Sequence, residues 1–212
     1  MEIFSLDSRL YQICLWMYNF MYLNILFILS CIPIITIFPA IAALFGVVRK
    51  WKITKEVAVF SQYKEMFIEN WKQSYLVGIV YTVIGVLLIF DLLFLQQMNI
   101  PYKKVIHVAV LFVSFLVGLS FLSIYPLMVN MITTFKQLCM NSLKVGIYKI
   151  HLSIFCMVIL SAWTILSLRF TFFFFFFFFS VSAYLIYWIA DLKFRHLIPK
   201  NESANQLNNK SA

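Results

Sequence analysis

Five apolar stretches of about 20 residues or more dominate the sequence and restrict the folds open to it. A helix needs about 20 residues to cross the roughly 30 Å hydrocarbon core of a bilayer. The stretches run over about residues 22–48, 75–95, 105–128, 147–167 and 172–190. They predict an all-α fold, a polytopic transmembrane helical bundle of about five spans in a single domain, residues 1–198. The polar residues 199–212 are expected to form a disordered cytoplasmic tail.

The composition favours a membrane protein over a soluble one. Of the 212 residues, 63% are hydrophobic and 12% are charged, against about half and a quarter in soluble domains. The formal net charge of +9 does not indicate nucleic-acid binding, because the basic residues lie between the apolar stretches and form no contiguous basic face. The four cysteines form no CxxC pair and are interpreted as free thiols.

The first apolar stretch contains two prolines. Pro33 and Pro39 each remove a backbone donor and disfavour a straight helix, and Thr36 between them can bond to the freed backbone groups. We therefore expect residues 22–48 to cross once, as a broken helix. A second arrangement stays open, in which residues 10–48 cross twice and give six spans with the N-terminus inside the cell.

Lysine and arginine are divided unequally between alternate connecting segments. Four of them, Arg9, Lys103, Lys104 and Arg169, fall on one side and thirteen on the other. The thirteen are Arg49, Lys50, Lys52, Lys55, Lys64, Lys72, Lys136, Lys144, Lys149, Lys193, Arg195, Lys200 and Lys210. Because cytoplasmic segments carry the excess of basic residues, we predict a multi-pass protein of the cell membrane with its N-terminus outside and its C-terminus in the cytoplasm.

Aromatic residues are expected at both membrane interfaces. In the single-crossing arrangement, Trp16, Tyr18 and Tyr22 fall in the outer belt and Trp51 falls in the inner belt. Residues 4–20 would then lie along the outer interface as an amphipathic helix.

Two stretches on the basic side have the pattern of amphipathic helices. After Thr54, aromatic residues recur every three to four positions, which places them on one helical face, and residues 134–146 repeat this pattern on a smaller scale. We interpret both as cytoplasmic interfacial helices that hold lipid headgroups or dock on a partner. The candidate docking residues are Phe60, Phe67, Trp71 and Lys72 in the first stretch and Phe135 and Lys136 in the second.

The sequence contains no pattern typical of catalysis or metal binding. It has no glycine-rich phosphate loop, HExxH or GxSxG motif, and its three histidines lack metal-ligand spacing. We therefore expect a non-enzymatic protein without a cofactor or a metal. Asp91 lies in an otherwise apolar run, and an intramembrane charge is a functional candidate. It either pairs with a basic residue near the outer interface or couples an ion or a solute to transport.

The last apolar stretch begins with eight consecutive phenylalanines, residues 172–179. Phenylalanine is compatible with lipid, and the run is long enough to cross only together with residues 180–190. A run of TTT or TTC codons invites slippage, so we expect length variants to arise here.

Three segments resemble the YesL family of bacterial membrane proteins, a domain of unknown function. The segments are NILFIL with PIITIFPAIAAL at residues 24–29 and 33–44, FIENWKQS at 67–74, and YPL, FKQL and NSL at 125–127, 135–138 and 141–143. They are similar, in order, to the family's broken first span, to the basic-aromatic stretch before its second span, and to a third conserved segment. Phe38 stands where the family usually has glycine.

The resemblance implies an accessory role. Genes of YesL-like proteins often lie beside sugar-uptake ABC transporters and two-component regulators, which implies a non-enzymatic accessory partner of carbohydrate uptake or sensing. The implied partners are the lipid bilayer and a sugar ABC permease or a sensor kinase. The alternative is an autonomous small-solute transporter that uses the broken first span (Pro33, Thr36 and Pro39) and Asp91.

Overall fold

The computed structural model describes residues 9–54, 58–97, 102–131 and 133–197, and within these ranges the chain is helical with no strand. The elements are α1 (Arg9–Ser30), the 3₁₀ turn η1 (Ile34–Thr36), α2 (Ile37–Thr54), α3 (Val59–Glu69), α4 (Trp71–Gln97), α5 (Lys103–Asn130), α6 (Phe135–Ile147), α7 (Ile150–Arg169), α8 (Thr171–Phe176) and α9 (Phe178–Leu197). The predicted all-α class is confirmed.

Five of the described helices are long and apolar enough to cross a membrane. They cover Leu10–Ser30, Ile34–Ile53, Trp71–Leu95, Lys103–Asn130 and Ile150–Arg169. The number agrees with the prediction, but the set differs. The first two both come from the region expected to cross once, and the predicted span 172–190 is not among them. It lies within α8 and α9, where α9 also carries Asp191 and Lys193.

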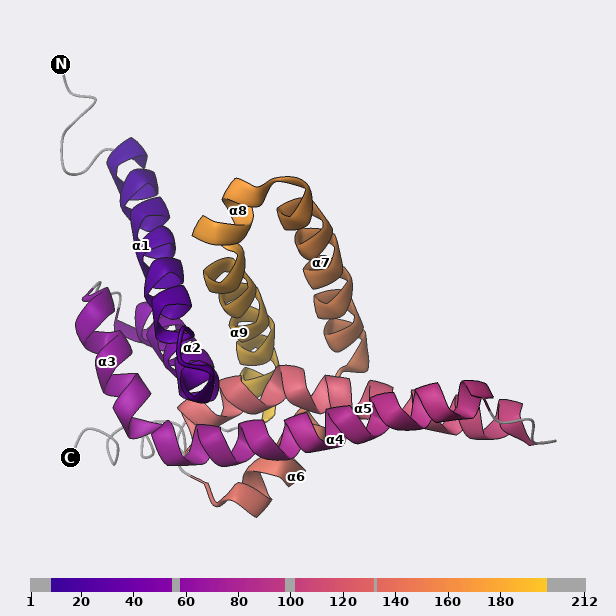
Figure 1. Ribbon diagram of the computed structural model, residues 1–212. Helices are drawn as coiled ribbons and strands as arrows, with labels where there is room; N and C mark the ends of the chain where they lie inside the picture. The colour runs from indigo at the N-terminus through magenta and orange to yellow at the C-terminus, as the bar shows by residue number, and fades with distance from the viewer. Residues whose placement is uncertain (1–8, 55–57, 98–101, 132, 198–212) are drawn as a thin grey trace.

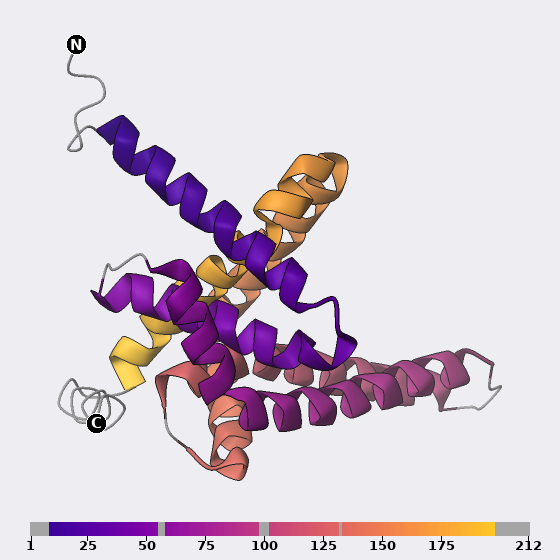
Figure 2. The ribbon, with the colours of Figure 1, turned by 60° about the vertical axis from the view of Figure 1, so that its left-hand side comes forward.

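The predicted single crossing by residues 22–48 is wrong, because the chain turns back between α1 and α2 (Figure 2). The Thr36 hydroxyl donates to the carbonyl oxygens of Ser30 and Pro33, which closes the turn. Pro33 ends the helical hydrogen-bonding pattern because it has no N–H. Pro39 lies in the first turn of α2, where a missing N–H costs no helical hydrogen bond. The two prolines therefore produce a hairpin and not a kinked span.

Aromatic contacts join the two helices of this hairpin at the end opposite the turn. The ring centroids of Trp16 in α1 and Trp51 in α2 are 6.0 Å apart, and Phe20 lies 5.4 Å from Trp51. The two tryptophans therefore lie at the same end of the hairpin, so their predicted assignment to opposite interfaces is wrong. The prediction of a separate interfacial helix over residues 4–20 is also wrong for the part that the structure describes, since α1 is continuous from Arg9 to Ser30.

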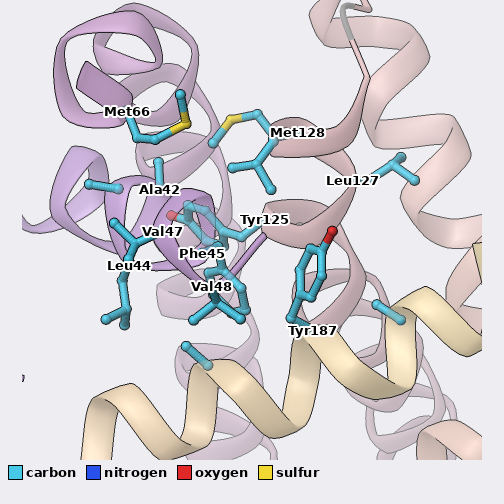
Figure 3. Close-up of a cluster of buried hydrophobic side chains, with 14 of the residues drawn as sticks. Ala42, Leu44, Phe45, Val47, Val48, Met66, Tyr125, Leu127, Met128 and Tyr187 are labelled. Carbon is cyan, nitrogen blue, oxygen red and sulfur yellow. The ribbon is translucent and has the colours of Figure 1, made fainter. Parts of the chain in front are cut away.

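Helix α2 is the centre of the packing. Of the residues in the most apolar part of α2, 61% are buried, whereas in the corresponding parts of α4 and α5 only 11% are buried. Figure 3 shows Phe45 of α2 beside Tyr125 of α5, with rings 6.0 Å apart and nearly parallel. Gly46 allows α3 to approach, because a Cβ there would lie 2.5 Å from the Met66 side chain. The cluster continues through Met128 of α5 and into α9.

The remaining long helices form two pairs. Figure 1 shows α4 and α5 side by side, extending to one side of the molecule, while α7 and α9 form a second pair joined through α8. The predicted span 172–190 is interrupted at Phe177, between α8 and α9. No proline causes this break. Its cause is a side chain of α1, Asn24, which binds the backbone on both sides of Phe177.

Candidate functional site: the basic end and the elbow surface

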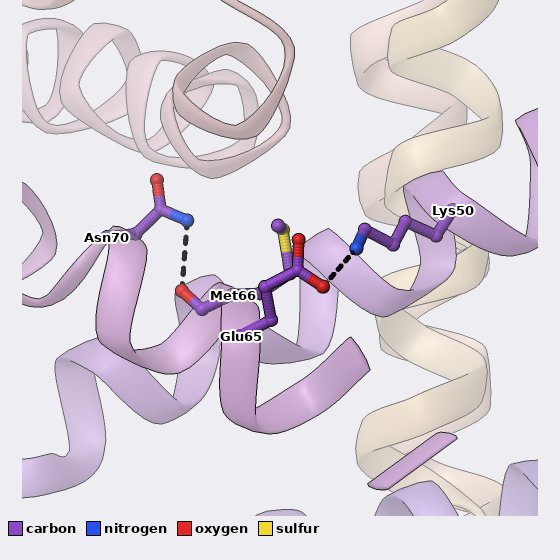
Figure 4. A network of polar contacts seen from close by, with 4 residues as sticks. All are labelled: Lys50, Glu65, Met66 and Asn70. Atoms are coloured by element: carbon purple, nitrogen blue, oxygen red, sulfur yellow. Dashed lines mark hydrogen bonds and ion pairs between the residues drawn. The ribbon is translucent and has the colours of Figure 1, made fainter. Parts of the chain in front are cut away.

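Two ion pairs join the helix ends that carry the basic residues. Lys50 Nζ of α2 is 2.6 Å from Glu65 Oε2 of α3, as Figure 4 shows. Lys52 Nζ is 2.8 Å from Asp191 Oδ2 of α9, with both side chains about three-quarters buried. We call the region around these pairs the basic end. The pairs are formed between distant parts of the chain, so they fix how α2, α3 and α9 meet.

The basic end also contains two buried cations. Lys193 is 3% exposed, and its Nζ donates to Val145 O at 3.3 Å and to the Ser153 hydroxyl. Arg49 is 6% exposed, and its Nε has no hydrogen-bond partner. Among the described residues neither side chain forms an ion pair. Removing a cation from water costs several kcal/mol, and for Lys193 the two acceptors offset part of that cost.

The first candidate docking stretch is only partly exposed. Phe60 is 57% exposed, and Lys72 is exposed. Phe67 is half-buried, with its ring 5.1 Å from that of Trp71 and 6.2 Å from that of Tyr63. The aromatic face expected from the spacing is therefore divided, because Tyr63 packs against the core and Phe60 points away from it.

The second candidate stretch is α6. Phe135 is half-buried against the core, and Lys136 is exposed. Gln137 Oε1 accepts the backbone N–H of Thr134 at 3.3 Å, which helps to start the helix. The exposed apolar residues that the prediction did not name are Met140, Leu143 and Ile147, which recur at helical spacing along one side of α6.

A hydrogen bond brings the two stretches together. Gln73 Nε2, at the start of α4, donates to Thr133 O, just before α6, at 3.0 Å. The bond therefore places the end of the first stretch beside the start of the second. We call the six candidate docking residues together the elbow surface: Phe60, Phe67, Trp71, Lys72, Phe135 and Lys136. The sequence predicted the two stretches but contains no signal for the bond between them.

The residues proposed for transport are not brought together. The Thr36 hydroxyl is used within its own turn, and Pro33 and Pro39 flank that turn. Asp91 is exposed on α4. A groove of about 520 Å³ between α2, α4 and α5 is lined by none of these four residues.

The cysteines are free thiols, as predicted. Cys31 lies in the turn between α1 and η1, where burial raises the pKa of its thiol to about 11. Burial also raises the pKa of Cys139 in α6. Both thiols are therefore protonated at neutral pH and weakly reactive.

Comparison with known proteins places the chain beside two curated relatives. It is 30% identical over 112 residues to the uncharacterized protein YesL of Bacillus subtilis (strain 168), which covers 51% of this chain and 54% of YesL. It is 30% identical over 130 residues to the uncharacterized protein YteU of the same organism, covering 58% of this chain and 57% of YteU. The chain thus spans little more than half the length of the curated relatives it matches.

A family match covers the hairpin and the helices after it. No solved structure matches the chain. Residues 20–92, from the middle of α1 to the last part of α4, match the family described as "Protein of unknown function, DUF624". These residues contain the α1–α2 turn, α3 and four of the six residues of the elbow surface. The resemblance to YesL-like membrane proteins expected from the sequence is thereby confirmed, through residues 20–92 and the two relatives, all of which are described as uncharacterized or of unknown function.

Proposed function

We propose that the protein is a non-enzymatic membrane subunit that docks on a partner protein through the elbow surface. The observation that carries this proposal is the Gln73–Thr133 hydrogen bond, which holds the start of α4 beside the start of α6, 60 positions away in the chain. The elbow surface combines an exposed aromatic side chain, Phe60, with the exposed cations Lys72 and Lys136. Aromatic residues with a charged rim are typical of protein interfaces.

The expected partner is a sugar ABC permease or a sensor kinase. This expectation rests on the resemblance to YesL-like proteins. An accessory subunit needs no catalytic group of its own, which agrees with the sequence.

We further propose that both termini lie on the cytoplasmic side, with α8 and α9 together returning the chain as a sixth crossing. The Trp16–Trp51 contact supports this, because it places the start of α1 beside the end of α2. Arg9 then moves from the sparse side to the basic side, and the division of basic residues changes from thirteen against four to fourteen against three. The asymmetry that sets orientation becomes stronger.

Co-purification with matched variants tests the docking proposal. The variant Phe60→Ala/Lys72→Glu alters the elbow surface, and Phe94→Ala/Lys104→Glu makes the same changes at exposed positions at the other end of α4 and α5. We expect a sugar permease or sensor kinase in stoichiometric amounts with the unmodified protein and the control, and its loss with the elbow variant. The proposal is contradicted if the same amount of partner is recovered with all three proteins, or if no such partner is recovered.

Autonomous transport is the second candidate, because two helix breaks line one pocket. Cys31 and Ile32 from the first break, and Phe175 and Phe179 on the two sides of the second, line a pocket of about 420 Å³. Broken helices form the solute sites of many transporters. Purified protein in liposomes should then move a sugar or an ion above background, and Asp91→Asn should reduce that flux. Liposomes without such flux exclude this function.

A further inference from the structure

Helix α6 packs on the bundle with one face only. Its inner face approaches α5 closely at Gly146, where a Cβ would lie 2.9 Å from Leu119 O. The apolar residues of its outer face are 41–50% exposed: Met140, Leu143 and Ile147. They are three and four positions apart, so they form one stripe along the outside of the helix. An exposed apolar stripe of this kind marks a surface that contacts lipid or another protein.

Two hydrogen bonds hold both ends of α6 at the basic end. Just before the helix, Thr133 O accepts from Gln73 Nε2 at the start of α4, and Figure 2 shows α6 beside that start. In the last turn, Val145 O accepts at 3.3 Å from Lys193 Nζ, two residues after Asp191, which forms one of the two ion pairs. A helix of 13 residues is about 20 Å long, too short to cross a core of roughly 30 Å. Helix α6 therefore lies along the membrane surface at the basic end.

The lysines beside the stripe have no counter-charge nearby in the chain. Lys144 is exposed, and Lys149 directly follows α6, with Nζ 5.8 Å from the centre of the Tyr148 ring. Among the described residues, neither lysine forms an ion pair. The sequence has no aspartate or glutamate from residue 92 to residue 190, so α5, α6, α7 and α8 contain no acidic residue. The negative charge that balances these lysines therefore comes from outside the chain.

We propose that the outer face of α6 binds anionic phospholipids of the leaflet at the basic end. The apolar stripe of Met140, Leu143 and Ile147 lies against the first methylenes of the acyl chains, and Lys144 and Lys149 bind the phosphate groups. An apolar face flanked by lysines is typical of helices that lie in the interface and select anionic lipids. Neither lysine belongs to the elbow surface, so the inference stands whether or not a partner docks there.

Photolabelling in vesicles tests the binding of anionic lipid. The full chain is reconstituted into phosphatidylcholine and phosphatidylglycerol (3:1) with a trace of phosphatidylglycerol that carries a diazirine near its headgroup, and labelled chymotryptic peptides are mapped by mass spectrometry. Lys144→Gln/Lys149→Gln removes both charges, and Lys144→Arg/Lys149→Arg is the matched control that keeps them. Thermal unfolding in detergent confirms that both variants fold.

We expect labelling of residues 134–149 in the unmodified protein and in the arginine variant. In the glutamine variant it should fall at least fivefold, the equivalent of about 1 kcal/mol, which one lysine near an anionic surface contributes. An excess of unlabelled phosphatidylglycerol should compete with the probe, whereas phosphatidylcholine should not. Labelling that is unchanged in the glutamine variant, or that both lipids reduce equally, would overturn the proposal.

A spin label on the stripe separates lipid contact from the alternatives. In a chain whose four cysteines are replaced by alanine, Met140→Cys is labelled and reconstituted into the same vesicles with no other protein present. Collisions with oxygen, which concentrates in lipid, should exceed those with a water-soluble nickel chelate. Stronger relaxation by the chelate would place the stripe in water, where a protein partner could cover it. Strong coupling between two spin labels would place a second copy of the chain there, and either result excludes the lipid.

Discussion

Asn24 in α1 caps α9 through Ser180, a residue 156 positions away in the chain. Asn24 Oδ1 accepts the backbone N–H of Ser180 at 3.1 Å and that of Phe179 at 2.9 Å. Its Nδ2 donates to Phe175 O at 2.7 Å. These are backbone groups that the break at Phe177 frees, and lipid offers no replacement for them. The last apolar stretch is therefore shaped by an amide in the first.

Replacing Asn24 should destabilise the protein strongly. Asn24→Leu keeps the side-chain size similar but leaves two buried N–H groups unpaired, at about 1–3 kcal/mol each. We expect a loss of about 2–6 kcal/mol, measured by thermal unfolding in detergent. Ser182→Ala is the control, since that hydroxyl donates only within its own helix, to Phe178 O, and should cost less than about 1 kcal/mol. Equal stability of the two variants would show that the cap is not needed.

The hairpin, together with a return crossing by α8 and α9, predicts that the two ends of the chain face the same compartment. Reporter proteins fused to the N-terminus and to the C-terminus should both be active only as cytoplasmic reporters, because α1 with α2, α4 with α5, and α7 with α8 and α9 each return the chain to the side on which they start. A reporter inserted after Lys104, at the start of α5, serves as the control and should give the opposite result. Ends on opposite sides would mean that the number of crossings is odd, either because residues 22–48 cross once or because α8 and α9 do not return the chain.

The contact between Phe38 and Gly78 predicts a pair of coupled substitutions. A Cβ at Gly78 would lie 2.1 Å from the Phe38 ring, so Gly78→Ala forces that ring to move and should cost about 1–3 kcal/mol. Phe38→Gly in the same chain removes the obstacle, and we expect Gly78→Ala to cost less than about 1 kcal/mol in that background. A double-mutant cycle measures the coupling.

Gly85→Ala is the matched control for this pair, because a Cβ at that position meets no atom within 4 Å. We expect it to stabilise the helix by up to about 1 kcal/mol, since alanine is the better helix former. The contact would be refuted if Gly78→Ala lowered the free energy of unfolding by the same amount in the presence and in the absence of the Phe38 side chain.

The half-buried thiol of Cys31 predicts an unusual pH dependence of alkylation. We consider a chain in which Cys14, Cys139 and Cys156 are replaced by alanine. The thiolate reacts, and burial raises the pKa of Cys31 to about 11. In the folded protein the rate should therefore rise about tenfold per pH unit up to about pH 11, whereas in the unfolded chain it should level off near the ordinary thiol pKa of about 8.5. Folded and unfolded rates with the same pH profile would contradict this.

The sequence predicted the class of the fold and most of its helices, because long apolar runs and positions of basic residues have few interpretations in a membrane protein. It did not predict the direction of the chain after Ser30. Pro33 and Pro39 are compatible with a kink and with a full turn, and the choice depends on where the Thr36 hydroxyl bonds and on the packing of Trp16 against Trp51. Those contacts are tertiary, and no periodicity contains them.

The candidate residues show the same limit. The spacing of Phe60, Phe67 and Trp71 indicated an amphipathic helix correctly, but the width of the buried stripe depends on how closely α3 approaches Gly46. The groove between α2, α4 and α5 was missed because its signal consists of absent side chains at Gly85 and Gly118. Small residues at three- to four-residue spacing on α4 could have indicated it, although such spacing more often marks helix packing.

The position of the Asn24 cap determines what a change in the number of phenylalanines does. Helix α9 takes its register from Asn24 and not from α7, because the cap holds residues 179 and 180, at the end of the run. An added or deleted phenylalanine therefore lengthens or shortens α8, and the residue that moves into each place is chemically identical to the one that left it. The repeat that is most prone to slippage in the gene thus codes for the segment whose length the protein can change while every residue from Ser180 onward keeps its neighbours.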